Sequence, residues 1–257
     1  MKLMLSLTLC FLLLPHLCGA GPLEDLEKAK NAAKNKDCAT AINLLEPLTK
    51  DETVLRHIKA QAFFYLSYCV PSEKQLEYAQ NALRFNDKTS EFHYRCAEIL
   101  HTMKQPQQAL QYLRSALDLI DGTGVNAAKA RYRELAALCY WEQRDKANAA
   151  MNLSSALEQT PDNPHLHLLR GRVLSEDGTV HDPRAVESFK EALRLGLTQE
   201  QSAQCSIYLG KLHEYSRQLD EASLYYARAH KDTKNELLKK QIEIKLKSFT
   251  TLKRWNA

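Results

Sequence analysis

The stretch IYLGKLHEYSRQLDEASLYYARAH, residues 207–230, predicts two amphipathic helices joined by a turn at Ser216–Leu219. Apolar residues recur three or four positions apart on both sides of that turn, which is the spacing of a single helix face. Gly210 nevertheless lies inside the first helix, where glycine is about 1 kcal/mol less favourable than alanine. Packing around Gly210 must therefore offset its low helix propensity.

Small residues recur along the chain at the spacing seen in this stretch. Ala222 and Ala229 lie seven residues apart on the second predicted helix, and the same pairing is found in segments further upstream. The equivalent first positions, separated by 34, 34, 40, 36 and 37 residues, are Ala41, Gln75, Ala109, Ala149, Ala185 and Ala222. The sequence is thus built from about six units of similar length.

A period near 34 residues with two helices in each unit resembles the tetratricopeptide repeat. Leu209-Gly210 on the first helix and Ala222, Tyr226 and Ala229 on the second fit the pattern of that family. The resemblance implies that the two helices of a unit cross so closely that only Gly or Ala fits at the contact. This crossing would account for Gly210.

The resemblance covers about residues 23–234 and implies an all-α fold, a right-handed superhelical solenoid of antiparallel helix pairs. We expect the array of about six pairs to occupy residues 21–234. The segments DGTGVNAAK, from Asp121, and SEDGTVHDP, from Ser175, depart from the pattern and predict longer loops. Residues 235–257 predict a C-terminal helix and tail that cap the last unit, because terminal repeats need such a cover.

The first 20 residues differ from the rest and predict a secretory signal peptide. Lys2 precedes an apolar run over residues 3–14, and small residues at Cys18 and Ala20 favour cleavage before Gly21. The run is too short to span a bilayer, and no later stretch is apolar enough, so we expect no transmembrane segment in the mature chain. The predicted location is the secretory pathway, whether secreted, lumenal in the endoplasmic reticulum, or periplasmic.

The cysteines do not form a recognisable framework. Removal of the signal peptide would leave Cys38, Cys69, Cys96, Cys139 and Cys205, an odd number with irregular spacing that names no disulfide pair and no zinc site. The sequence also lacks a phosphate-binding loop, a nucleophile elbow and a metalloprotease helix. We therefore expect no metal, no cofactor and no enzymatic activity.

First helices of such repeats line a concave groove, and the family pattern implies which side chains face it. The mixture of cations and aromatic rings at these positions suits an extended peptide with acidic or aromatic side chains. The predicted partner-binding residues are Lys30, Lys34, Phe64, Tyr68, Tyr94, His101, Arg131, Trp141, Arg172, Lys211 and Tyr215. Trp141 offers the largest rigid contact area, and Arg131 could pair with a ligand carboxylate.

A sequon at Asn152 could accept a glycan, but it lies in the middle of a predicted helix, which favours an unmodified side chain. The formal charge of +4 is spread along the chain and does not indicate nucleic acid as a partner. The predicted function is a non-enzymatic scaffold that binds a protein or extended peptide. Two alternatives remain: a lumenal holdase or co-chaperone without a J domain, and a bacterial envelope assembly factor resembling repeat-containing pilotins.

Overall fold

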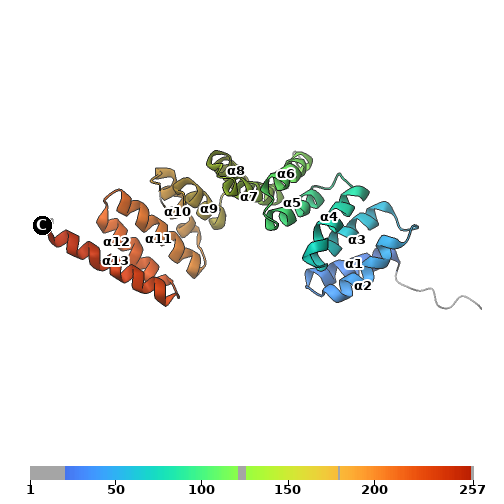
Figure 1. Cartoon of the computed structure of the whole chain (residues 1–257), viewed down its shortest axis with the longest axis horizontal. Coiled ribbons are helices and arrows are strands. Elements are labelled where there is room, and N and C mark those ends of the chain that lie inside the picture. Colours follow the sequence, from blue (N-terminus) through green and yellow to red (C-terminus); the bar gives the residue numbers. More distant parts are fainter. Residues whose placement is uncertain (1–20, 121–125, 179, 256–257) are drawn as a thin grey trace, which may run out of the picture. The chain divides into compact units, whose positions relative to one another are not determined.

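The computed structural model describes residues 21–120, 126–178 and 180–255, and every regular element in these ranges is an α-helix (Figure 1). The predicted all-α solenoid of helix pairs is confirmed, whereas the predicted signal peptide, residues 1–20, lies outside the described residues. The helices are α1 (Pro22–Lys34), α2 (Cys38–Lys50), α3 (Arg56–Cys69), α4 (Ser72–Phe85), α5 (Ser90–Thr102), α6 (Pro106–Ile120), α7 (Asn126–Glu142), α8 (Lys146–Gln159), α9 (Pro164–Ser175), α10 (Pro183–Leu195), α11 (Gln199–Tyr215), α12 (Leu219–Asp232) and α13 (Glu236–Trp255).

Four of the turns inside helix pairs share one backbone feature. Lys36, Lys104, Arg144 and Arg217 have left-handed φ angles of 63°, 60°, 64° and 58°, and each lies in a turn of three residues between two helices. A left-handed residue reverses the chain within a short space, although it is unfavourable by roughly 1–2 kcal/mol for any residue other than glycine. The packing of the two helices must therefore maintain these turns.

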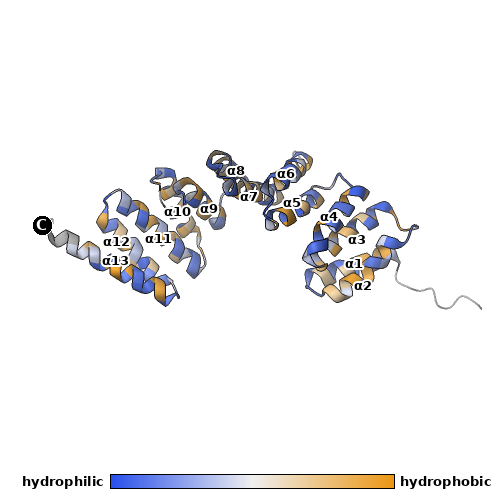
Figure 2. Ribbon diagram, in the orientation of Figure 1, coloured by the Kyte–Doolittle hydropathy of each residue, from blue (hydrophilic) through white to orange (hydrophobic). Residues whose placement is uncertain are grey.

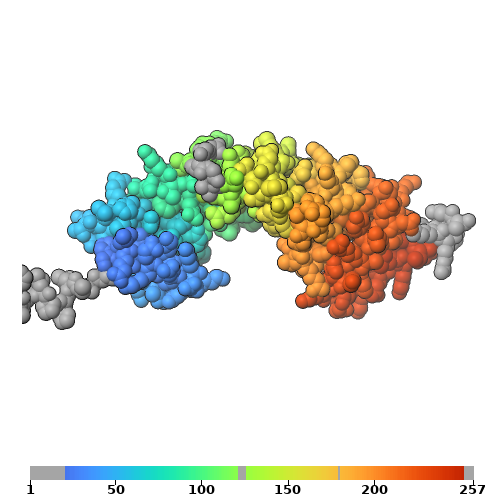
Figure 3. Space-filling model, turned by 180° about the vertical axis from the view of Figure 1, so that it is seen from behind, coloured from blue at the N-terminus to red at the C-terminus, as the bar shows by residue number. Residues whose placement is uncertain are grey.

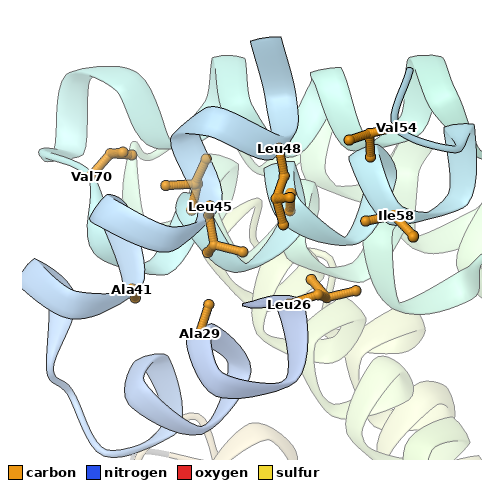
Figure 4. Close-up of a cluster of buried hydrophobic side chains, with 10 residues drawn as sticks. Leu26, Ala29, Ala41, Leu45, Leu48, Val54, Ile58 and Val70 are labelled. Carbon is orange, nitrogen blue, oxygen red and sulfur yellow. The ribbon is translucent and has the colours of Figure 1, made fainter. Parts of the chain in front are cut away.

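The chain divides into two compact units, residues 1–100 and 101–257, which are described separately. In the first unit α1 packs on α2 and α3, α2 packs on α3, and α3 packs on α4. The core of α1, α2 and α3 is drawn in Figure 4 and contains Leu26, Ala29, Ala41, Leu45, Leu48, Val54, Ile58, Ala62, Leu66 and Val70.

Helices α2 and α3 run in opposite directions through this core. Figure 4 shows Ala41, near the start of α2, on the same side as Val70, which follows the end of α3. Leu48, near the end of α2, lies towards Ile58, near the start of α3. The start of α2 and the end of α3 are consequently neighbours.

The second unit contains helices α6 to α13, and each of them packs on the next one along the chain. Figure 3 follows this order across the surface from green to red. Among the described residues, its core includes one cluster from α7, α8 and α9, one centred on α9, α10 and α11, and one from α12 and α13. Most helices carry both hydrophobic and hydrophilic residues (Figure 2), and no helix in the described part of the chain is long and apolar enough to cross a membrane.

The small residues that reveal the repeat lie at helix contacts. Five of the equivalent positions are fully buried alanines, each 0% exposed: Ala41, Ala109, Ala149, Ala185 and Ala222. Gly210 lies against a ring of the paired helix, since an added Cβ would be 3.1 Å from three ring atoms of Tyr226. Gly171 is still closer to its partner, because an added Cβ would be 2.6 Å from two ring atoms of Phe189.

Helix α13 covers the apolar face of α12. Ile242 and Phe249 are each 3% exposed and belong to one cluster with Ala222, Tyr226 and Ala229. The rings of Tyr226 and Phe249 lie 5.9 Å apart between centroids. Burial of these apolar side chains holds α13 on the second unit.

Candidate partner-binding site

An aromatic pocket in the first unit contains three of the residues that the repeat pattern assigned to the groove. Its volume is about 250 Å³, and its lining residues, from α1, α3 and α5, are Ala33, Lys34, Phe64, Tyr65, Tyr68 and Glu91. Phe64 is buried and forms a floor, whereas Tyr68 is 41% exposed. Lys34 and Glu91 add one charge of each sign to the rim.

The aromatic rings of this pocket support one another. The centroid of Phe64 lies 5.1 Å from that of Tyr65 and 5.3 Å from that of Tyr68, both edge to face. Phe92 lies behind Phe64, with its centroid 4.9 Å away. Burial raises the pKa of Tyr65 further above physiological pH, and its phenol is neutral there in any case. The pocket is thus an apolar surface that is already formed.

Arg95 fixes the exposed ring of the pocket. Its guanidinium carbon lies 3.8 Å from the centroid of Tyr68, which is a cation–π contact. The same guanidinium donates to the Ser67 carbonyl oxygen at 2.8 Å and to the Ser67 hydroxyl at 3.1 Å, and it pairs with Glu98 at 3.3 Å. Because Arg95 is held from several sides, Tyr68 is held in one place before any ligand arrives.

The remaining groove residues of the first unit are placed differently. Tyr94 is buried at 7% exposure, so its ring contributes to the interior, contrary to the groove position that the pattern implied. Lys30 is partly buried and pairs with Glu27 on its own helix at 3.3 Å. Residues that lie next to a groove position on the same helix, such as Tyr65, take part in the pocket instead.

In the second unit, Trp141 and Arg172 meet in a narrow crevice of about 40 Å³ between α7, α8 and α9. The Trp141 ring is partly buried and packs on the cluster that includes Ala137 and Leu153. A crevice of this size holds about one water molecule and no peptide side chain. Trp141 therefore packs with the core and does not line a groove wide enough for a peptide.

The guanidinium of Arg172 forms an ion pair with Asp177, a residue of the loop that interrupts the fifth unit. Its Nε donates to Asp177 Oδ1 at 2.9 Å, and the Tyr208 hydroxyl donates to the same oxygen at 3.4 Å. Burial raises the pKa of Tyr208, which keeps the hydroxyl protonated and able to donate. Lys211 lies beside this group, with its Nζ 5.8 Å from the Tyr208 ring. The loop thus provides Arg172 with an internal carboxylate.

The other predicted groove residues of the second unit are spread over separate places. Tyr215 is 69% exposed and stacks on His181 with 6.3 Å between ring centroids. His101 lies 3.5 Å from Glu142, and Arg131 is exposed, with its guanidinium carbon 5.9 Å from the Tyr132 ring. The structure does not bring these side chains together into one pocket.

Two larger hollows lie on α8, α9 and α10, with volumes of about 520 Å³ and about 580 Å³. Both are larger than the aromatic pocket, and both have long charged side chains in their lining, among them Arg170, Arg184 and Lys190. Neither is lined by Phe, Tyr or Trp, so neither offers the rigid aromatic surface of the first-unit pocket. Their larger volume therefore does not make them better candidates for the partner-binding site.

Asn152 is 3% exposed, and its amide donates to the Asn148 carbonyl oxygen at 2.9 Å and accepts from Arg133 at 3.1 Å. This burial favours an unmodified side chain. Among the described residues, no group of three or more His, Cys, Asp or Glu side chains is placed to hold a metal ion.

Asp177 and Tyr208 are structural partners that the repeat pattern missed, and the contact of Arg95 with Tyr68 was not predicted either. Arg95 of α5 contacts Tyr68 of α3, and Asp177 of the loop pairs with Arg172 of α9 and accepts a hydrogen bond from Tyr208 of α11. Spacing along one helix carries no signal for such contacts.

No protein-family model matches the sequence, and no curated protein matches it. Solved structures do resemble it. PilF of Pseudomonas aeruginosa aligns with a TM-score of 0.67 and 15% identity over 87% of this chain and 97% of PilF. MamA from Desulfovibrio magneticus RS-1, solved from residue 41 to its end, aligns with a TM-score of 0.57 and 17% identity over 69% of this chain and 96% of the solved chain. YrrB, described as a TPR protein with an unusual peptide-binding site, aligns with a TM-score of 0.54 and 13% identity over 83% of this chain and 96% of YrrB. Together with its own repeat, these likenesses show that the chain has the fold of the tetratricopeptide repeat proteins.

Proposed function

We propose that the chain is a non-enzymatic scaffold of the secretory pathway that binds a protein through an extended peptide segment. The aromatic pocket formed by Lys34, Phe64, Tyr65, Tyr68 and Glu91 is the principal contact site. A repeat array of helix pairs provides a broad surface without built-in chemistry, which suits binding better than catalysis.

The observation that supports this proposal most directly is the half-exposed ring of Tyr68, which Arg95 holds in place beside the buried ring of Phe64. Rigid aromatic surface lowers the entropy lost on binding, and aromatic anchors supply much of the affinity of protein interfaces. Lys34 would pair with an acidic residue of the ligand, and Glu91 with a basic residue or an amino group. The ligand is thus a segment with an apolar or aromatic side chain next to charged residues. YrrB, whose described property is a peptide-binding site, supports a peptide as the class of ligand.

The secretory part of the proposal rests on the N-terminal 20 residues, with Lys2 before an apolar run and small residues before Gly21. Expression of the full chain in a cell that secretes proteins, followed by N-terminal sequencing, tests it. We expect a mature chain that begins at Gly21 in the secretory or periplasmic fraction. A cytosolic product that keeps residues 1–20 would contradict the location and leave the binding proposal standing.

Selection of a random peptide library against the purified chain tests the binding site. We expect selected peptides to carry an aromatic or aliphatic residue flanked by charge. Tyr68→Ala should weaken their binding about tenfold, which corresponds to about 1.4 kcal/mol. Lys34→Ala should weaken peptides with an acidic flank more than peptides without one.

Leu55→Ala is the matched control, because Leu55 is an exposed apolar residue at the other end of α3, 61% exposed. Its removal should leave affinity unchanged. Equal affinity of wild type, Tyr68→Ala and Lys34→Ala for every selected peptide would place the binding surface elsewhere.

A further inference from the structure

Two cysteines that lie 31 residues apart in the sequence meet at one end of the first unit. Cys38 is the first residue of α2, directly after its N-cap Asp37, and Cys69 is the last residue of α3. Since α2 and α3 are antiparallel, with Ala41 and Val70 on the same side of their shared core, these two ends are neighbours (Figure 4).

The two side chains lie close to each other. Both are free thiols that are partly exposed, and Cys38 helps to raise the pKa of Cys69, an effect that requires the two side chains to be near one another. Cys69 also packs on the core of α1, α2 and α3, so its side chain is held in position by its surroundings. Helices α2 and α3 pack directly on each other, so the two thiols lie at adjoining helix ends, and proximity of the two residues is the first geometric demand of a disulfide.

We propose that Cys38 and Cys69 form a reversible disulfide that joins the start of α2 to the end of α3. The oxidant is a small-molecule disulfide of the glutathione class. One thiol attacks it, which forms a mixed disulfide and releases one thiol molecule with the proton. The other cysteine then attacks the protein-bound sulfur and releases the second thiol molecule. Two protein thiols are oxidised and one small disulfide is reduced to two thiols, so atoms and electrons balance.

The surroundings indicate the order of attack. Burial, and after it the neighbouring Cys38, raises the pKa of Cys69 to about 12. Cys69 also packs on the core of α1, α2 and α3, which restricts the approach of a small molecule to its sulfur. Cys38 therefore takes up the small molecule first, and Cys69 then attacks the protein-bound sulfur because it lies beside it.

The other three cysteines of the mature region provide internal controls. Cys96, Cys139 and Cys205 are each 0% exposed, and burial raises the pKa of each thiol to about 12. Folded protein thus shields them from a small oxidant, and they should stay reduced under conditions that oxidise Cys38 and Cys69.

Incubation of the purified folded chain with oxidised glutathione, followed by acid quenching and blocking of free thiols, tests the proposal. Trypsin cleavage after Lys36, Lys50, Lys59 and Lys74 separates the two cysteines into peptides 37–50 and 60–74. We expect these peptides to be linked, two hydrogen atoms lighter than their sum, and to separate after reduction. Cys96, Cys139 and Cys205 should be recovered blocked.

Two single variants test the order of attack. Cys69→Ser should accumulate glutathione on Cys38, whereas Cys38→Ser should leave Cys69 reduced. Glutathione on both cysteines of the wild-type chain without a link, a link to a different cysteine, or two reduced thiols after prolonged oxidation would overturn the proposal. The mapping on the wild-type chain decides the pairing even if a variant fails to fold.

Discussion

Gly171 packs against the ring of Phe189 so closely that a Cβ added to Gly171 would be 2.6 Å from two ring atoms of Phe189. A Cβ added to Gly210 would be 3.1 Å from the ring of Tyr226. Both glycines are in the first helix of a pair and both rings are in the second helix. The same crossing is therefore tighter in α9 and α10 than in α11 and α12.

This difference predicts two unequal substitutions. Gly171→Ala should destabilise the chain by roughly 1–3 kcal/mol, since the fully buried Phe189 ring cannot retreat without repacking. Gly210→Ala should change stability by less than about 1 kcal/mol, because gained helix propensity of about 1 kcal/mol offsets a milder contact. Gly210→Leu should be destabilising by about 1–3 kcal/mol.

Chemical denaturation of the three variants checks these values. Gly21→Ala is a control, because an added Cβ there meets nothing within 4 Å. A Gly171→Ala variant as stable as wild type would show that the α9–α10 crossing yields more readily than its geometry indicates.

Trp141 and Tyr215 were both assigned to the groove by the repeat pattern, yet their surroundings differ. The Trp141 ring packs on buried Ala137 and Leu153, while Tyr215 is 69% exposed. Trp141→Ala should lower stability by about 2–4 kcal/mol through lost packing. Tyr215→Ala should change it by less than about 0.5 kcal/mol. Thermal melts of the two variants, followed by circular dichroism, make the comparison. Equal melting temperatures would show that the Trp141 side chain does not stabilise the core and would support its assignment to the groove.

Removal of α13 should uncover the apolar face of α12. Without residues 236–257, Tyr226 and Ala229 lose the cover that Ile242 and Phe249 provide. An exposed apolar face of this kind promotes association, so the truncated chain should melt earlier and self-associate with increasing concentration. Light scattering after size-exclusion chromatography measures the association. Truncated protein that remains monomeric with an unchanged melt would identify α13 as an independent appendage.

The contact between α7 and α9 should depend on pH. His165 Nε2 lies 3.2 Å from Glu134 Oε1, and this hydrogen bond raises the pKa of His165 above its ordinary value. A pKa raised in the folded state adds stability that is fully present below the unfolded pKa of about 6.5 and is lost as the pH rises through the folded pKa.

Unfolding free energies at about pH 5.5 and about pH 8.5 check this expectation, because the two values bracket the titration of histidine. The wild-type chain should lose more stability between them than His165→Gln does. The difference should be small, since the side chain is 48% exposed and water screens the pair. Identical pH profiles would show that the ion pair adds nothing to folding.

Sequence spacing was sufficient for the helix pairs because packing itself is periodic. Alanines occupy five of the six matched positions and are fully buried there, and Gly210 was recognisable as a close contact from its place in the repeat. Gly171 is also a close contact between two helices. The insertion within the fifth unit changes the distance in sequence from Gly171 to Ala185, so the repeat pattern did not single out Gly171.

The candidate site was only partly predictable. Lys34, Phe64 and Tyr68 came from the repeat pattern, whereas Arg95 and Glu91 act across from α5, and Asp177 reaches Arg172 from a loop. Tyr94 was assigned to the groove and is buried, because the family register assigns a helix face while the exposure of a side chain depends on how α5 packs on its neighbours. The proximity of Cys38 to Cys69 likewise depends on which helix ends are neighbours, and the spacing of cysteines in the sequence carries no information on that.

Stepwise packing gives the chain a particular response to force. Helices in the second unit each lie on the next one along the chain, with no strand or distant segment clamping them from outside among the described residues. Pulled from its C-terminus, this unit should peel open one layer after another, at low force, instead of breaking in a single event. Each layer of about 36–40 residues would release roughly 120–130 Å of chain, so the length of the pulled chain should increase in steps of similar size.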